Sequence, residues 1–160
     1  MTFDPALDGV DHINIYSQAK TGLGKFLSNF TYSPFEHPED GSFLSIEGYW
    51  YWLGCKNEEL RHLYGFMAKK VGRENGSPDY MDDTEFKRKI KTAILIKIKN
   101  SNFLNIFIES SLPFAHYYNY KGKVVVPKEG LWVIEYIENL RSFLGENKWK
   151  KKTKQNTKQP

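Results

Sequence analysis

The pattern of hydrophobic and polar residues predicts several short strands, with a loop before the second of them. Apolar and polar residues alternate over His12–Tyr16 and over Asn105–Glu109, and the second run indicates a buried strand. Phe30–Phe35 is also strand-like, and Lys121–Val126 predicts a further strand near the end of the chain. The two glycines of Thr21–Lys25 favour a loop.

Apolar residues spaced three or four positions apart predict four helices. Ser45 can cap a first helix over Ile46–Trp52. Asn57 can cap a second, which we expect to continue to a C-terminal glycine cap at Gly72. A final helix is predicted over Lys128–Leu144. The third helix is amphipathic, with a cap at Asp82 or Asp83 and apolar residues at Phe86, Ile90, Ile94 and Ile98.

These elements predict a single compact α+β domain, mostly helical with a few short strands. A chain of 160 residues can bury one substantial core, and its apolar content of 40% is ordinary for a soluble protein. The aromatic content of 16% is high. Most such side chains pack in cores, although some line pockets for flat ligands. We expect the domain to cover residues 1–146.

A lysine-rich tail follows at residues 147–160 and holds the excess positive charge. The net charge of the chain is +4, but the six lysines of the tail leave −2 on the remainder. We expect the tail to be disordered and to add only a weak, salt-sensitive contact with nucleic acid. A nucleic-acid-binding protein driven by this tail is one of three functional hypotheses.

The composition argues against several classes of protein. Cys55 is the single cysteine, which excludes an intrachain disulfide and suits a reducing cytoplasm. The lysine-rich, aromatic-rich composition suggests the cytoplasm of a bacterium or a phage-infected cell. A buried or incidental thiol explains it better than a nucleophile does. We find no signal peptide and no apolar run that could span a membrane. His12, His37 and His62 have no metal-binding spacing, so we expect neither a metal nor a cofactor.

The first candidate site lies where the predicted loop meets the second strand. Lys25 supplies a cation, Ser28 and Asn29 supply small polar groups, and Phe30 supplies a ring. Such groups suit a phosphorylated ligand that carries a flat base. The alternative is a turn held by the Ser and Asn side chains, and the spacing alone favours this alternative.

The second candidate is Glu47, in the first turn of a predicted helix. A carboxylate at this position can simply complement the helix dipole. Aromatic residues, Trp50 among them, also surround it in the sequence. Such a setting can desolvate a carboxylate and raise its pKa into the range used for acid/base catalysis. Both interpretations stay open.

Two further candidates come later in the chain. Arg73 ends a basic cluster, which can complement the C-terminus of a helix or clamp a phosphate. Glu109 ends the predicted buried strand and precedes a polar, aromatic segment that contains His116. His116 is the histidine best suited to general acid or base catalysis, although a structural role is the more frequent one.

Taken in order, these residues resemble the NADAR family, also called YbiA-like. The resemblance extends from about Ile13 to Tyr120. Any one motif is weak, but four in the right order and at suitable spacing make the resemblance more specific. The segments are Lys25-Phe26-Leu27-Ser28-Asn29-Phe30 with Ser33-Pro34-Phe35, then Ser45-Ile46-Glu47, then Ala68-Lys69-Lys70-Val71-Gly72-Arg73, and finally Glu109-Ser110-Ser111.

The chain also departs from the family pattern. Gly48 replaces the His that follows the family's Glu, and Tyr51 and Gly54 replace a Gln and a Lys of the same helix. Asp79-Tyr80 is only a loose match to an Asp-Trp pair. Leu112–Tyr120 has no clear counterpart of the family's Asp and Trp-Gly. These departures favour binding of an ADP-ribose-like ligand over any particular reaction.

The resemblance implies a YbiA-like fold and hydrolysis of an N-glycosidic bond in an ADP-ribose-like or phosphoribosyl substrate, including ADP-ribosylated nucleobases. Glu47 would stabilise the sugar cation or activate water. Lys25 and Arg73 would hold phosphate, or Lys25 would act on the opened sugar. The other groups would orient or stack the ligand or position water, namely Ser28, Asn29, Phe30, Trp50 and Glu109.

The main alternative is a protein without catalysis. It would bind ADP-ribose or a related nucleotide and sense or sequester it. The residues that depart from the family pattern favour this alternative, and turnover of any ADP-ribosyl substrate would exclude it.

Overall fold

The computed structural model describes residues 2–76 and 83–156 of the chain. This part is a mixed α+β structure, about 52% helical, with short strands. The loose match Asp79-Tyr80 and the alternative helix cap Asp82 lie outside the described residues.

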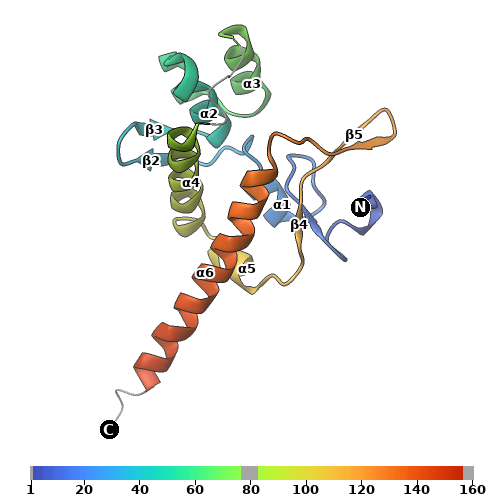
Figure 1. Ribbon diagram of the computed structural model, residues 1–160, viewed down its shortest axis with the longest axis vertical. Coiled ribbons are helices and arrows are strands. Elements are labelled where there is room, and N and C mark those ends of the chain that lie inside the picture. Colours follow the sequence, from blue (N-terminus) through green and yellow to red (C-terminus); the bar gives the residue numbers. More distant parts are fainter. Residues whose placement is uncertain (1, 77–82, 157–160) are drawn as a thin grey trace.

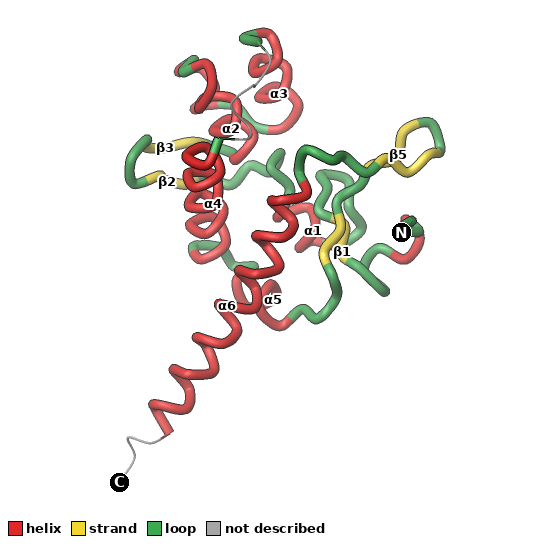
Figure 2. The backbone as a smooth tube through the Cα atoms, viewed as in Figure 1, coloured by secondary structure: helices red, strands yellow, loops and turns green. Residues whose placement is uncertain are grey.

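The described residues form helices and three separate pairs of strands (Figures 1 and 2). The helical elements are η1 (Pro5–Leu7), α1 (Gly22–Leu27), α2 (Ile46–Cys55), η2 (Glu58–His62), α3 (Gly65–Glu74), α4 (Thr84–Lys99), α5 (Leu104–Glu109) and α6 (Leu131–Asn156). The strands are β1 (Ile13–Asn14), β2 (Phe35–His37), β3 (Gly41–Phe43), β4 (Phe114–Ala115), β5 (Tyr118–Tyr120) and β6 (Lys123–Val125). Strands β1 and β4 pair in parallel, whereas β2–β3 and β5–β6 are antiparallel hairpins.

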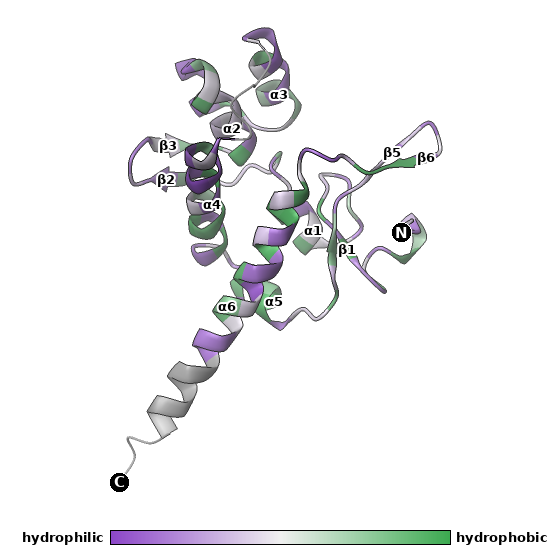
Figure 3. Ribbon diagram, in the orientation of Figure 1, coloured by the Kyte–Doolittle hydropathy of each residue, from purple (hydrophilic) through white to green (hydrophobic). Residues whose placement is uncertain are grey.

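Two predicted helices are confirmed together with their caps. The Ser45 hydroxyl accepts a hydrogen bond from the Gly48 amide over 3.0 Å and begins α2. The Asp83 carboxylate accepts from the Glu85 amide over 3.0 Å and begins α4. The four apolar residues predicted for α4 are each at most 4% exposed, and the helix carries both hydrophobic and hydrophilic residues (Figure 3). This one-sided burial is what the four-residue repeat requires.

Aromatic side chains fill the core between the β2–β3 hairpin, α2 and α4. The ring centroids of Phe43 and Tyr49 are 4.7 Å apart, and Phe43 and Trp52 meet edge to face at 5.2 Å. Asp40, at the tip of the hairpin, accepts hydrogen bonds from the Tyr49 hydroxyl (2.7 Å) and from Lys89 Nζ (3.0 Å). These bonds tie the hairpin to both helices. The ring contacts between them indicate that many of the aromatic side chains serve packing.

Three of the predicted elements are wrong. Thr21–Lys25 belongs to helix α1 rather than a loop, because the Thr21 hydroxyl caps it by accepting from the Gly24 amide over 2.9 Å. Phe30–Phe35 is not a strand, and β2 begins only at Phe35. Asn105–Glu109 lies in helix α5, which buries Phe107 and packs against α6. Tertiary packing overrides the alternating pattern there.

The second predicted helix is divided into two elements. Gly65 has a φ of +59°, which interrupts the chain between η2 and α3. Helix α3 then continues to Glu74, so Gly72 lies inside the helix and is not a C-terminal cap. Gly72 instead allows a close approach between helices, described below.

The final helix is longer than predicted. Helix α6 begins at Leu131 and continues to Asn156, beyond the predicted end at Leu144. Figure 1 shows its C-terminal half extending away from the rest of the molecule. Residues 147–156 of the lysine-rich tail therefore continue the helix. A search of the described helices finds none with both the length and the apolarity to cross a lipid bilayer.

Candidate functional site

The start of α2 places Glu47 beside the segment that contains Asn29. The Glu47 amide donates a hydrogen bond to the Asn29 carbonyl over 2.9 Å. Ser45, which caps the helix, also donates from its hydroxyl to the Leu63 carbonyl over 2.9 Å. Two segments that the sequence analysis singled out separately therefore meet through the backbone.

Glu47 is half-buried as a residue, and its carboxyl group has a strongly shifted pKa. Burial raises the pKa of Glu47 from 4.5 to about 7, while the nearby charges of Lys69 and Arg73 act in the opposite direction. Desolvation dominates because the hydration that the charged carboxylate loses on burial outweighs its attraction to the two cations. A carboxyl group with this pKa can give or take a proton near neutral pH, which general acid/base catalysis requires.

Small residues allow α3 to pack against α2, and two cations of α3 lie close enough to Glu47 to act on its carboxyl. Ala68 and Gly72 are buried in this interface. A Cβ atom at Gly72 would lie 2.1 Å from Cγ of Tyr51, so only glycine fits against that ring. Lys69 and Arg73 each follow one of the small residues, and both act on the carboxyl of Glu47.

Tyr51 is influenced by both Glu47 and Arg73. It lies four residues after Glu47 on α2, so the two side chains share one helical face. The Arg73 side chain forms a hydrogen bond with Tyr51. Burial and the charge of Glu47 raise the pKa of the Tyr51 phenol, while Arg73 lowers it. The phenol therefore stays protonated at neutral pH, and it feels the charges of both Glu47 and Arg73.

Phe30 and His116 also lie near Lys69. Lys69 Nζ is 5.7 Å from the centre of the Phe30 ring, which is itself half-buried. The charge of Lys69 lowers the pKa of His116, although burial is the larger cause. His116 Nδ1 lies 2.7 Å from the Ile15 carbonyl oxygen, which requires a protonated Nδ1. In the neutral ring, Nε2 is then a proton acceptor.

The paired strands β1 and β4 hold His116 in this position. The Asn14 side chain accepts from the Tyr117 amide (3.0 Å) and donates to the Tyr117 carbonyl (2.9 Å). This bidentate bond fixes the chain just after β4. It joins residues about a hundred positions apart in the sequence, as the Ile13–Phe114 pairing does.

The first candidate segment forms a tight turn whose polar groups largely bind the backbone. The buried Ser28 hydroxyl accepts from the Phe30 amide over 3.2 Å, as the turn interpretation expected. Lys25 is exposed at the end of α1, and its carbonyl accepts from the Ser28 amide. A contact of Lys25, Ser28 or Asn29 with a ligand stays a prediction.

Trp50 and Glu109 have partners on other elements. Trp50 is 8% exposed, stacks on Trp132 of α6 at 5.7 Å and meets Phe86 of α4 edge to face at 4.8 Å. The Glu109 side chain is 72% exposed and lies 3.5 Å from Lys148 Nζ on α6. These contacts place both residues against α6, whereas the cations that act on the Glu47 carboxyl lie on α3. Their ligand roles stay predictions.

The sequence analysis missed Lys69 and Tyr51 as members of the site. Lys69 was part of the Ala-Lys-x-x-Gly-Arg segment, and its position four residues before Arg73 was a signal that both cations share a helical face. Tyr51 was noted as a departure from the family and as one of the aromatic residues beside Glu47, without a role of its own. Its spacing of four from Glu47 was the corresponding signal.

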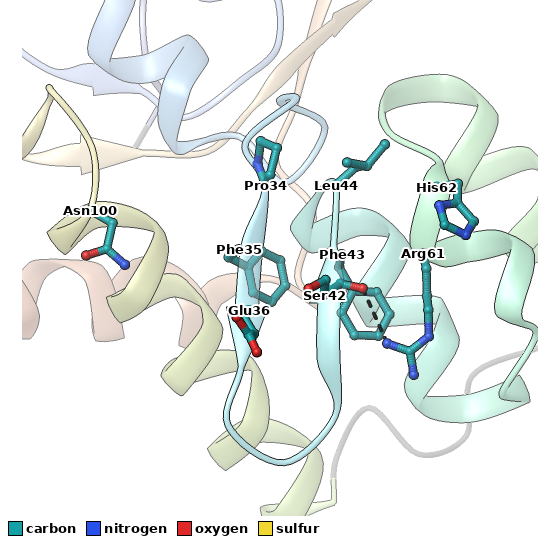
Figure 4. Close-up of a pocket in the computed structure, with 9 residues that line it drawn as sticks. All are labelled: Pro34, Phe35, Glu36, Ser42, Phe43, Leu44, Arg61, His62 and Asn100. Carbon is teal, nitrogen blue, oxygen red and sulfur yellow. Dashed lines mark hydrogen bonds between the residues drawn. The ribbon is translucent and has the colours of Figure 1, made fainter.

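Two cavities are described, and Glu47 lines neither of them. The larger, of about 340 Å³, lies along the β2–β3 hairpin, where Arg61 donates to the Ser42 carbonyl over 3.3 Å (Figure 4). The smaller, of about 160 Å³, includes Asp8 and Tyr117 near the N-terminus. Asp8 binds two backbone amides, so its carboxylate already has partners.

Groups of three or more potential metal ligands (His, Cys, Asp or Glu) are absent from residues 2–76 and 83–156. No family model, no curated protein and no solved structure matches this chain. The residues around Glu47 therefore carry the inference of function.

Proposed function

We propose that this protein hydrolyses an N-glycosidic bond in an ADP-ribose-like or phosphoribosyl substrate, an ADP-ribosylated nucleobase among the candidates. The observation that carries the proposal is the carboxyl of Glu47, whose pKa burial raises to about 7 beside Lys69 and Arg73. The resemblance to the NADAR family supplies the reaction class. The site supplies groups that suit it.

Cleavage of an N-glycoside passes through a sugar with oxocarbenium character. In the proposed reaction, Glu47 takes a proton from water as the water oxygen bonds to the anomeric carbon. The bond to the base nitrogen breaks, and its electron pair leaves with the base, which then takes a proton. Negative charge on Glu47 also stabilises the cationic sugar in the transition state.

The cations of α3 suit the phosphate groups of such a substrate. Arg73 offers a planar fork that pairs well with phosphate oxygens, and Lys69 adds a second positive charge. The ring of Phe30, which lies beside Lys69, is available for stacking on a base. His116 has an acceptor nitrogen near the same lysine, which suits it to orient a hydroxyl group or water.

The test is release of free base from NAD and from ADP-ribosylated DNA, measured together with ligand binding. Glu47→Gln should bind ADP-ribose as well as the original protein does but lose turnover. Glu59→Gln removes an exposed carboxylate of η2 and is the matched control, which should retain turnover. Near-normal turnover by Glu47→Gln would exclude the catalytic assignment.

One observation favours a second candidate, a nucleotide-binding protein without catalysis. A Cβ atom at Gly48 would lie 2.4 Å from the Leu60 carbonyl oxygen, so no larger side chain fits there. Gly48 stands where the family carries a His, and the Leu60 carbonyl leaves no space for a His side chain there. Binding of ADP-ribose without release of base from any substrate would favour this candidate.

A further inference from the structure

Lys97 of α4 is a buried cation that the proposed reaction does not use. It is 4% exposed, and its Nζ donates a hydrogen bond to the Ser28 carbonyl over 3.0 Å. The same nitrogen lies 5.0 Å from the centre of the Phe26 ring. Burial alone shifts its pKa, downward to about 7, and among the described residues no carboxylate pairs with it. Such a group is costly to bury.

The bond from Lys97 belongs to a set of three that holds one short segment. The carbonyls of Ser28, Asn29 and Phe30 each accept a hydrogen bond from a different helix. Lys97 Nζ binds the first from α4, the Glu47 amide binds the second from the start of α2, and the Gly65 amide binds the third from the start of α3, both at 2.9 Å. The two helices that carry Glu47, Lys69 and Arg73 are thus joined at this segment.

The lysine is not needed merely to satisfy the Ser28 carbonyl. The Thr31 amide already donates to that oxygen over 3.2 Å. An apolar side chain at position 97 would avoid the burial of an amine. What the lysine adds is a fixed distance between α4 and the segment 28–30. A costly group with this single polar contact points to a role in positioning.

We propose that Lys97 is a positioning residue for the Glu47 site. It holds the segment 28–30 in place from α4, and this segment in turn fixes the starts of α2 and α3. The inference deepens the proposed function and rests on it for the effect on turnover, but the positioning itself is measurable without turnover.

The test is amide hydrogen exchange in Lys97→Met, which has similar volume but no donor. The Glu47 and Gly65 amides should exchange about tenfold faster, whereas the Asn14 amide, which binds Asp8 elsewhere in the fold, should be unchanged. Lys99→Met removes an exposed lysine of the same helix and should alter none of these rates. Lys97→Arg keeps a donor and should retain most of the protection.

In the release assay, Lys97→Met should lower kcat on the order of tenfold and leave KM nearly unchanged, because geometry and not ligand contact is lost. Unchanged exchange at Glu47 and Gly65 would overturn the inference, as would equal acceleration at Asn14. If the Met variant does not fold, Lys97→Leu, which also lacks a donor, carries the same test. If the original protein releases no base, the proposed function fails, and the exchange rates still decide the role of Lys97.

Discussion

The Glu47 amide donates a hydrogen bond to the Asn29 carbonyl over 2.9 Å, and this bond connects the two most informative segments of the sequence. Glu47 carries the carboxyl group with the raised pKa, and Asn29 belongs to the turn after α1. Because both partners are backbone groups, the contact depends on the conformation of the turn and tolerates changes of the Asn29 side chain. The path of the chain thus matters as much here as the polar side chains do.

The first prediction concerns the pH dependence of stability. The pKa of Glu47 is higher in the folded protein, so this group lowers stability as the pH rises from about 4.5 through 7. Glu47→Gln removes that penalty. Its free energy of unfolding should exceed that of the original protein by about 1–3 kcal/mol more at pH 8 than at pH 4, so the variant gains relative stability as the pH rises. Urea titrations at both pH values measure this difference. An identical difference at the two pH values would contradict the account.

The second prediction concerns the contact between Gly72 and Tyr51. Gly72→Ala should destabilise the protein by about 1–3 kcal/mol, because the added methyl group overlaps the ring. Gly145→Ala is the control. It lies in α6, where a Cβ atom would be 3.8 Å from Ile108, an ordinary contact. It should be neutral or stabilise the protein by up to about 1 kcal/mol. Thermal unfolding measures the stability of the two variants. Equal stability would contradict a tight interface between α2 and α3.

The third prediction concerns Lys69, whose charge lowers the pKa of both Glu47 and His116. Lys69→Met should weaken ADP-ribose binding on the order of tenfold, through the loss of one phosphate contact. It should also shift the pKa of Glu47 further upward, since an opposing cation is removed. Lys70→Met, an exposed neighbour on α3, is the control. Equal affinities for the two variants in calorimetry would remove Lys69 from the site.

The fourth prediction concerns the lysine-rich tail. Replacing Lys150, Lys151, Lys152 and Lys154 by Gln should weaken binding to DNA at low salt and make its salt dependence less steep by about 3 in the log–log slope. Base release from NAD should be unaffected, because the small substrate does not need the tail. Unaltered DNA affinity would show that the tail makes no such contact.

The sequence predicted elements best where caps and spacing agreed. Ser45 and Asp83 both bind backbone amides as expected, and α2 and α4 follow. It failed where a short alternating run was read without its neighbours. The residues of α5 fit a strand pattern, but packing against α6 made them helical. The break at Gly65 depends on a positive φ that a helical stripe does not reveal.

The site was predicted in its parts and not in its arrangement. Residue type and order identified Glu47, Phe30, Arg73 and His116. Phe30 lies beside Lys69, and the charge of Lys69 lowers the pKa of Glu47 and of His116. The charge of Arg73 also lowers the pKa of Glu47. The pairing of β1 with β4, which carries His116 to this region, joins residues about a hundred positions apart. Two-residue strands leave almost no trace in the sequence pattern, so this proximity could not be predicted.

The most direct test of the account is a ¹³C NMR titration of the glutamate carboxyl groups. The account predicts one carboxyl signal that titrates near pH 7, is absent in Glu47→Gln and moves to higher pH in Lys69→Met. The rate of base release should follow the same titration. If every glutamate titrated near its ordinary value of about 4.3, Glu47 would not be the acid/base group, and the central claim would be contradicted.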